Sequence, residues 1–434
     1  MSTPATSATR RRPVTMTPLP QAHAEETEQW LTRVEKVTGL LAEHRSRAEE
    51  DRATSPEVID ALREQGFHRM WVSRAFGGAG VSLRTGSAVL QAIARTDPSA
   101  AWQMGVQGAI GRISDYLSDQ AACRLFCSSH GLVVGGINPT GQAVPVPGGY
   151  RLRGRWSFAS GATHADWLVA SAVVTGGCAQ TSTNTPARRS TPAHAPTQVP
   201  AQAQVPGSAP TGSAPIRMLC VPRGAATFTD DWHALGLRGT GSGTFTVDNI
   251  VVPESQTVDG SLLRRPPTAR KSRGYAIAYY DFAPFTTAST ALGIAQDALR
   301  AFRQLALQTV PARATETLAG GHTVQATFAR ATALVRASRL MLEDAADQAT
   351  ERGENGGDEL SGVIRLAAAA VGENCVQAVT MLHTAAGASA LRSGGDLDRC
   401  FRDVHTAARH ITLAATNFEM VGAHLFGGTL LMRR

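Results

Sequence analysis

The sequence predicts a mostly helical α+β protein with an N-terminal α-helical domain, a middle β-barrel or sandwich domain and a C-terminal four-helix bundle. Near both ends of the 434-residue chain, apolar residues recur at three- and four-residue steps, which is the period of half-buried helices. Between these regions, short β-type stretches alternate with Gly, Pro, Asn and Asp turns. These changes of period divide the chain into residues 1–24, 25–134, 135–255 and 256–434.

Residues 1–24 are expected to form a disordered tail, because they are rich in Ser, Thr, Pro and Arg and lack the apolar run of a signal peptide. The first helical stripe follows, with Trp30, Val34 and Leu41 on one face. Ser55-Pro56-Glu57 then opens another helix, since serine caps a helix N-terminus and proline suits its first position. This helix should end near Gly66.

The β-domain contains a low-complexity insert. Strands are expected at Tyr150–Trp156, Trp167–Val174, Ile216–Val221 and Thr244–Val252. Residues 175–215 consist largely of Ala, Pro, Thr, Gln and Ser, with almost no large apolar side chains that would offset their ordering entropy. We therefore expect a disordered excursion between neighbouring strands, with a functional lid as the alternative.

The third region is Ala-rich and helical. Its long periodic runs are Ala291–Leu307, Val324–Ala349, Gly362–Ala386 and Asp398–Phe426. Four long helices joined by short loops indicate an antiparallel bundle.

Composition argues against several classes of function. The net charge is +7, but the basic residues are almost all arginines and form no long stripe interleaved with aromatic residues, so we expect no nucleic-acid partner. No apolar run reaches the roughly 18 residues that a membrane span needs. The six cysteines form no C-x-x-C pair, and no His, Cys and Asp set has metal-ligand spacing. The pattern is typical of a reduced, cytoplasmic protein without a metal site.

Several motifs, in this order, resemble the acyl-CoA dehydrogenase superfamily and, within it, the flavin-dependent monooxygenases. The glycine cluster at Phe76–Leu83 lies between helices and does not follow a strand, so it is no dinucleotide fingerprint. The other motifs are Gly148–Gly161 with His164–Trp167, Leu235–Ser242 with Val252–Glu254, Ala291–Ala295, and Arg399–Asp403 with His410 seven residues later.

The two branches of this superfamily need different residues. A dehydrogenase needs a carboxylate base to remove an α-proton, and many members carry a glutamate shortly after the Arg-Asp pair of the last bundle segment. This chain has His410 near that point, and its next acid is Glu419. Glu373 is a candidate for the other common base position. The resemblance thus favours the monooxygenase branch, and a dehydrogenase or oxidase with a displaced base and a catalytically idle member remain as alternatives.

The resemblance implies the oxygenase component of a two-component system. Reduced FMN or FAD would diffuse from a separate NAD(P)H:flavin reductase, since the chain has no Rossmann motif after a strand with which to bind NAD(P)H. O₂ as co-substrate would give the C4a-hydroperoxide, which inserts one oxygen atom into a small organic substrate. Relatives of this kind are tetramers, so a homotetramer is expected. The sequence leaves the substrate open.

The resemblance also assigns the site residues. Ser160 stands where dehydrogenases place a flavin-contacting threonine and is expected at the flavin N5 edge. His410 would donate to the peroxide or accept a substrate proton, because imidazole titrates near neutral pH. A packed bundle histidine and a serine that bonds only to nearby backbone are the alternatives. The expected flavin-binding residues are Asn138, Pro139, Thr140, Phe158, Ser160, Arg402 and Asp403, and the expected substrate-pocket residues are Trp102, Gln103 and Gln107.

Three of these assignments carry a further alternative. Arg402 and Asp403 could instead form a structural ion pair. Phe158 could belong to the core of the β-domain. Some relatives carry a histidine about where Gln107 stands, and this departure puts the transfer of active-site detail in doubt.

Overall fold

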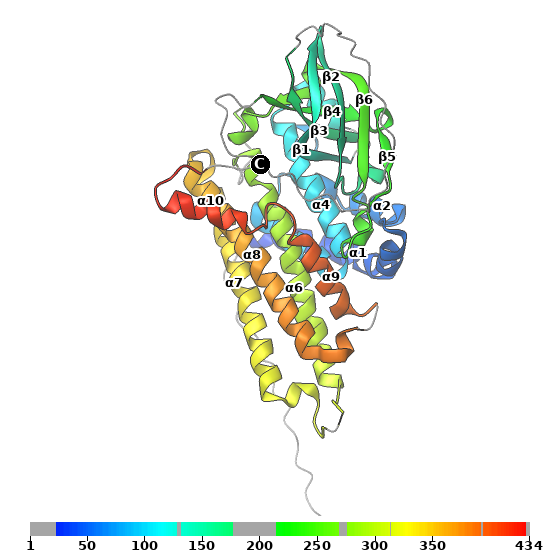
Figure 1. Cartoon of the computed structure of the whole chain (residues 1–434), viewed down its shortest axis with the longest axis vertical. Coiled ribbons are helices and arrows are strands. Elements are labelled where there is room, and N and C mark those ends of the chain that lie inside the picture. Colours follow the sequence, from blue (N-terminus) through cyan, green and yellow to red (C-terminus); the bar gives the residue numbers. More distant parts are fainter. Residues whose placement is uncertain are drawn as a thin grey trace, which may run out of the picture.

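The computed structural model describes residues 23–127, 132–176, 214–268, 276–312, 314–391 and 394–430. Nearly all of the expected tail and of the expected insert therefore lie outside the described residues, and α1 begins at Ala24, inside the expected tail. In Figure 1 the sheet occupies one end of an elongated molecule, and the long C-terminal helices extend to the other end. The N-terminal helices pack alongside both.

The N-terminal region contains five α-helices: α1 (Ala24–Asp51), α2 (Pro56–Glu64), α3 (Leu83–Thr96), α4 (Pro98–Gly111) and α5 (Asp119–Phe126). Helix α2 begins as predicted, because the Ser55 hydroxyl accepts the Val58 N–H at 3.4 Å. The chain turns sharply between α3 and α4 at Asp97, whose carboxylate accepts the backbone N–H groups of Ser99 and Ala100. This cap sets the direction of α4, which runs towards the sheet.

Trp71 joins the N-terminal helices to the bundle. Its side chain is 1% exposed, and it lies so close to Gly86 on α3 and Gly108 on α4 that a Cβ atom at either glycine would overlap the indole. The indole also makes an edge-to-face contact with Phe282, just before the first bundle helix, with ring centroids 5.1 Å apart. Trp71 can therefore pack against α3, α4 and Phe282 because Gly86 and Gly108 have no side chains.

The β-domain is one seven-stranded mixed sheet with the order β5-β6-β2-β1-β3-β4-β7. The four predicted strands are present, and the pair β1 and β3 is parallel. Strands β1, β5 and β7 were not predicted individually, and β7 lies beyond the expected domain boundary at residue 255. The strands are β1 (Val133–Val146), β2 (Gly149–Trp156), β3 (Trp167–Val174), β4 (Ile216–Pro222), β5 (Thr227–Thr229), β6 (Thr244–Pro253) and β7 (Thr257–Asp259).

Strand β1 carries a bulge at residues 137–140. Its register on β3 jumps from Gly136 opposite Ala170 to Gly141 opposite Ala172, so the residues between them leave the ladder. Trp156 packs beneath this bulge, and a Cβ atom at either flanking glycine would overlap its indole. The Trp156 Nε1–H donates to the Ser171 carbonyl at 2.8 Å. The tryptophan thus fixes where the bulge projects.

The bundle consists of α6 (Ala283–Gln308), α7 (His322–Arg352), α8 (Gly357–Ala386), α9 (Asp396–Ala407) and α10 (Thr416–Leu425). The first three cover the predicted runs. The fourth run was predicted as one helix, and that prediction was wrong at residues 408–415, which form turns. The Thr412 N–H donates to His410 Nδ1 at 3.3 Å instead of to a carbonyl of the helix ladder. Asn417 Nδ2 then donates to two carbonyls of the broken segment, at 2.9 Å each.

Two further features concern the redox state of the cysteines and the question of a membrane span. Cys123 and Cys127 form a disulfide, so the expectation that all cysteines are reduced is corrected. Cys123 lies on α5 and Cys127 directly follows its last residue, so the two cysteines are four residues apart, a spacing at which side chains on a helix are neighbours. None of the helices in the described part of the chain is both long and apolar enough to cross a bilayer.

The packing of Trp71 predicts opposite effects for two glycine substitutions. Gly86→Ala should lower the free energy of unfolding by about 1–3 kcal/mol, because overlap with a buried ring outweighs the gain in helix propensity. Gly39→Ala on α1 is the matched control. A Cβ atom there meets nothing within 4 Å, so stability should rise by about 1 kcal/mol. Urea unfolding measures both, and equal stabilisation would contradict this account of Trp71.

The neighbouring strands β3 and β4 predict that the insert is dispensable for folding. They pair in antiparallel register up to Val173 opposite Ile216, and the Val174 N–H donates to the Pro215 carbonyl at 2.7 Å. Replacing residues 177–213 by Asn-Gly, which favours tight hairpin turns, should leave the melting temperature within about 4 °C, as expected for a change below 1 kcal/mol. A variant that fails to fold would assign the insert a structural role.

Candidate active site

A cavity of about 950 Å³ lies between the sheet, helix α4, the start of α6 and the break between α9 and α10. Its volume is in the usual range for cofactor and small-molecule sites. Its aromatic lining residues are Trp102, Trp156, Phe158, Trp232, Tyr279, Tyr280 and Phe401. Its polar lining residues include Asn138, Thr140, Arg155, Ser157, Ser160, Thr240, Ser242, Thr287, His405, Thr406, Arg409, His410 and Thr412.

Phe158 stands in the cavity in a strained conformation. Its φ is 64°, in the left-handed region that bulky residues avoid, and its side chain is 68% exposed. An edge-to-face contact with Trp232, at 6.2 Å between ring centroids, supports the ring. The Ser160 N–H donates to the Phe158 carbonyl at 3.0 Å and tightens the turn. Phe158 is therefore no core residue, and strain of this kind is found mostly at functional sites.

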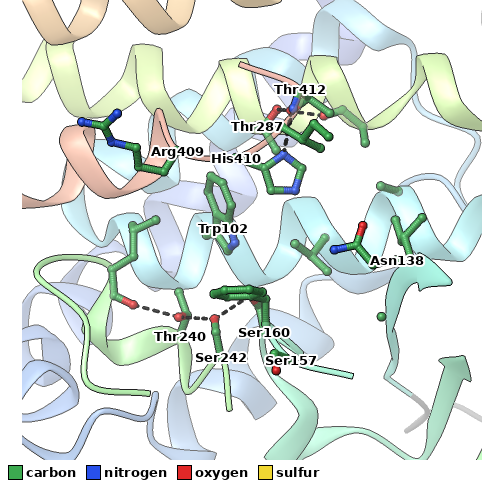
Figure 2. A pocket seen from close by; sticks show the side chains of 18 of the residues that line it. Trp102, Asn138, Ser157, Ser160, Thr240, Ser242, Thr287, Arg409, His410 and Thr412 are labelled. Atoms are coloured by element: carbon green, nitrogen blue, oxygen red, sulfur yellow. Dashed lines mark hydrogen bonds between the residues drawn. The ribbon is translucent and has the colours of Figure 1, made fainter. Parts of the chain in front are cut away.

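His410 points into the cavity from the break between α9 and α10 (Figure 2). Its ring packs edge-to-face on Trp102, with centroids 5.5 Å apart. The Thr412 N–H donates to Nδ1, and the Thr412 hydroxyl lies 2.8 Å from the same atom. Because Nδ1 accepts, the neutral ring carries its proton on Nε2, on the other side of the imidazole. The Thr412 hydroxyl is in turn 2.7 Å from that of Thr287 on α6, which fixes the ring's orientation.

Opposite His410, three hydroxyl groups form a chain along the cavity wall, as Figure 2 shows. Ser160 Oγ lies 2.7 Å from Ser242 Oγ, and Ser242 Oγ lies 2.6 Å from Thr240 Oγ1. The Thr240 hydroxyl donates to the Leu237 carbonyl at 2.8 Å. All three side chains are at most 5% exposed. We call Ser160, Ser242 and Thr240 the hydroxyl chain.

The β1 bulge brings two of its three expected residues to the cavity. Asn138 and Thr140 line it, whereas Pro139 does not. The Thr140 hydroxyl donates to the Arg155 carbonyl at 2.6 Å, which closes the bulge. The Asn138 side chain makes no hydrogen bond to the described residues, and Figure 2 shows it facing the cavity.

Two of the expected substrate-pocket residues lie elsewhere. Trp102 lines the cavity. Gln103 points to the other side of α4, where its Nε2 donates to the Thr54 hydroxyl at 2.6 Å. Gln107 is fully buried, and its Oε1 accepts the Val133 N–H at 2.6 Å. Both amides therefore hold α4 against neighbouring segments, and Trp102 is the one of the three expected residues that lines the cavity.

Arg402 and Asp403 also lie outside the cavity lining. Arg402 forms ion pairs with Glu49 and Asp398, at 3.0 Å each. Asp403 is 3% exposed and accepts the Leu237 N–H at 2.6 Å. Burial raises the pKa of the Asp403 carboxyl to about 7, against the opposing effect of that hydrogen bond. The two residues thus tie α9 to α1 and to the loop that carries the hydroxyl chain.

None of the lining residues in the described part of the chain is an aspartate or glutamate. The two acids offered as displaced bases, Glu373 on α8 and Glu419 on α10, are exposed and do not line the cavity. The titratable lining groups are Arg155, Arg409, His405, His410 and the two tyrosines. This set can donate and accept hydrogen bonds, but it offers no carboxylate base.

Several lining residues were not predicted. Thr240 and Ser242 belong to a motif that was recognised, but the contact with Ser160, 82 residues away, had no signal in the sequence. Thr412 stands in the expected run Asp398–Phe426, where threonine looks unremarkable, and Thr287 precedes the expected run Ala291–Leu307. His405 was not among the predicted site residues. It lines the cavity one turn before the break, and burial, with Arg409 and His383 nearby, lowers its pKa.

Two domain families match the helical parts of the chain. The family described as "Acyl-CoA dehydrogenase, N-terminal domain" matches residues 24–122. The family described as "Acyl-CoA dehydrogenase, C-terminal domain" matches residues 285–415. The second match ends just beyond the break that carries His410.

Curated relatives cover most of the chain at low identity. The "Pigment production hydroxylase" of Rhodococcus sp. is 25% identical, over 88% of this chain and 92% of the relative. The "FADH(2)-dependent resorcinol hydroxylase, oxygenase component" of Rhizobium sp. is 27% identical, over 92% and 93%. Among solved structures, XiaF from Streptomyces sp., in complex with FADH2 and glycerol, has a TM-score of 0.81 at 23% identity, covering 94% of this chain and 98% of that one.

The raised pKa of Asp403 predicts a pH-dependent stability. The folded-state pKa lies above the unfolded value of about 3.9, so this group's contribution is complete below pH 4 and is lost as the pH rises through 7. Asp403→Asn keeps an oxygen for the Leu237 N–H but does not titrate. From pH 5 to pH 8, the wild type should therefore lose about 1–3 kcal/mol of unfolding free energy relative to the variant. Urea unfolding at both pH values tests this, and a constant difference would contradict it.

Proposed function

The chain belongs to the acyl-CoA dehydrogenase superfamily, and we propose that it is the oxygenase component of a two-component flavin-dependent monooxygenase acting on a small organic substrate. One observation carries the proposal: the described lining of the large cavity contains histidines and hydroxyl groups but no carboxylate. A dehydrogenase must remove a carbon-bound proton with a base, and this lining offers no acid for that task. The names of the curated relatives, which are hydroxylases, agree with this choice.

The cavity fits a flavin ring. An isoalloxazine is flat and aromatic with one polar edge, and it needs apolar walls together with a few hydrogen-bonding groups. Trp102, Phe158 and Trp232 supply aromatic surface, and Asn138 and Ser160 supply polar groups at one side. Asn138, Thr140, Phe158 and Ser160 are therefore the residues that would hold it. Reduced flavin, when bound, supplies the activation of O₂.

The protein's own groups position the reactants and exclude water. Trp102 is 8% exposed and Ser160 is 3% exposed, whereas Phe158 is 68% exposed, so a bound flavin ring would have to cover Phe158 to exclude water from the site. His410 presents its Nε2–H from the wall opposite Ser160, and an N–H at this place can donate a hydrogen bond to a developing oxyanion. Thr412 holds the imidazole in that tautomer.

The proposal also covers the partner protein, the cellular compartment and the oligomeric state. A separate NAD(P)H:flavin reductase would supply the reduced flavin, and the phrase "oxygenase component" in the name of one relative supports this arrangement. Such a supply of NAD(P)H exists in the cytoplasm, where we place the protein. We propose a homotetramer, as the resemblance implies; the exposed side chains of Leu425 and Phe426 at the end of α10 offer an apolar surface for such contacts.

His410→Ala should uncouple the reaction. Product formation with reduced FMN or FAD, O₂ and a panel of phenols, indoles and amines should fall by about 100-fold or more. The affinity for reduced flavin should change little, because the imidazole lies on the wall opposite the flavin-binding groups. Hydrogen peroxide release should rise to account for the flavin consumed. Product chromatography and a peroxide assay measure the two yields.

His322→Ala is the matched control, since His322 is exposed at the start of α7, outside the cavity. It should leave both yields unchanged. The proposal as a whole is tested by supplying a flavin reductase and NAD(P)H to the purified chain. Bleaching of tightly bound oxidised flavin by an acyl-CoA, with no need for a reductase, would instead establish a dehydrogenase.

A further inference from the structure

We propose that Thr240 and Ser242 act as positioning residues that turn Ser160 into a hydrogen-bond acceptor towards the cavity, and that the site thereby selects reduced over oxidised flavin. This inference rests on the proposed function. Selection of the reduced form is a requirement for an oxygenase that takes its flavin from solution and must release it after oxidation. This selection follows from the direction in which the hydroxyl groups of the chain donate their hydrogen bonds.

The direction is set at the Leu237 carbonyl. This oxygen has no proton, and the Thr240 hydroxyl oxygen lies 2.8 Å from it. Two oxygens at that distance repel each other unless a proton lies between them. The only proton available is that of Thr240, so Thr240 donates to the carbonyl.

The direction then passes along the chain, because each hydroxyl has one proton. With its proton committed, Thr240 Oγ1 can only accept from Ser242, at 2.6 Å. Ser242 Oγ in turn accepts from Ser160, at 2.7 Å. Ser160 therefore points its proton into the wall and presents a lone pair to the cavity.

Several hydrogen bonds hold the Leu237 carbonyl, at which the hydroxyl chain ends, in place. The Leu237 carbonyl also accepts Trp232 Nε1–H at 3.1 Å and the Thr240 N–H at 3.2 Å. Leu237 itself has a φ of 50°, an unfavourable value for a leucine, and the bond from its N–H to Asp403 holds it there. The carbonyl cannot turn away without breaking all of these bonds.

An acceptor at Ser160 distinguishes the two redox forms of a flavin. N5 of the reduced ring carries a hydrogen and donates, whereas N5 of the oxidised ring has only a lone pair. Ser160 is the residue that the resemblance places at the N5 edge. A lone pair from Ser160 would stabilise the reduced form there and repel the oxidised form, so the hydroxyl chain favours reduced flavin from both directions.

The experiment measures dissociation constants for FMN and FAD, oxidised in air and reduced under anaerobic conditions. In Ser242→Ala and in Thr240→Val, the Ser160 proton is freed to turn towards the cavity. Both variants should bind oxidised flavin about five- to tenfold more tightly, by the worth of one hydrogen bond. Reduced flavin should bind within about twofold of wild type, since Ser160 can still accept. Thr240→Ser keeps the hydroxyl and should restore the wild-type ratio.

Ser157→Ala is the matched control. This serine lines the same cavity, but its hydroxyl is bonded to Thr244, outside the chain. The ratio of the two dissociation constants should not move. Equal changes for both redox forms in Ser242→Ala or Thr240→Val, or an unchanged ratio, would overturn the inference while leaving the proposed function intact. Failure of the wild type to bind reduced flavin would instead remove the proposed function.

Discussion

The cavity depends on the contact between α9 and the loop that precedes β6. The Asp403 carboxylate accepts the Leu237 N–H at 2.6 Å, and Gly236 lies so close to the Arg402 backbone that a Cβ atom there would overlap it. This contact joins the bundle to the sheet at one point and leaves a space beside it. It also holds Leu237 in the left-handed region, which aims the carbonyl that ends the hydroxyl chain.

Several strained or irregular backbone segments lie around this cavity. Among the described residues, five other than glycine have a positive φ, and two of them, Phe158 and Leu237, line the cavity. The third irregularity is the break at residues 408–415, where His410 takes the Thr412 N–H from the helix ladder. Each of these costs backbone free energy that packing elsewhere must offset. Regular elements such as α4, α6 and α9 supply walls of the site, and the irregular segments supply Phe158, His410 and the end of the hydroxyl chain.

The interruptions are also where sequence reasoning failed. The order of domains, the cap at Ser55 and the strands around Trp156 follow from periodicity and propensity, which act locally, and both family matches bear out the superfamily. The run from Asp398 to Phe426 has unbroken helical periodicity, and nothing local indicates that His410 would divert a backbone N–H. Gln103 and Gln107 closely follow Trp102 in the sequence, yet on α4 their side chains point to other neighbours. A residue's direction depends on packing that one sequence does not reveal.

The position of Asp403 also explains how the site is kept free of negative charge. A reduced flavin carries its own negative charge near neutral pH, and a carboxylate in the same low-dielectric cavity would repel it by several kcal/mol. The protein instead places the acid behind the cavity wall, where Asp403 accepts the Leu237 N–H. The hydroxyl chain then transmits the orientation of Leu237 to Ser160. The hydroxyl groups that face the cavity are neutral, and the acid that orders them lies behind the wall, where burial raises its pKa to about 7. A carboxylate base in the cavity would place negative charge next to the flavin. The same electrostatic repulsion therefore explains why the described lining has no such base and why Ser160 is oriented through a chain of neutral hydroxyl groups.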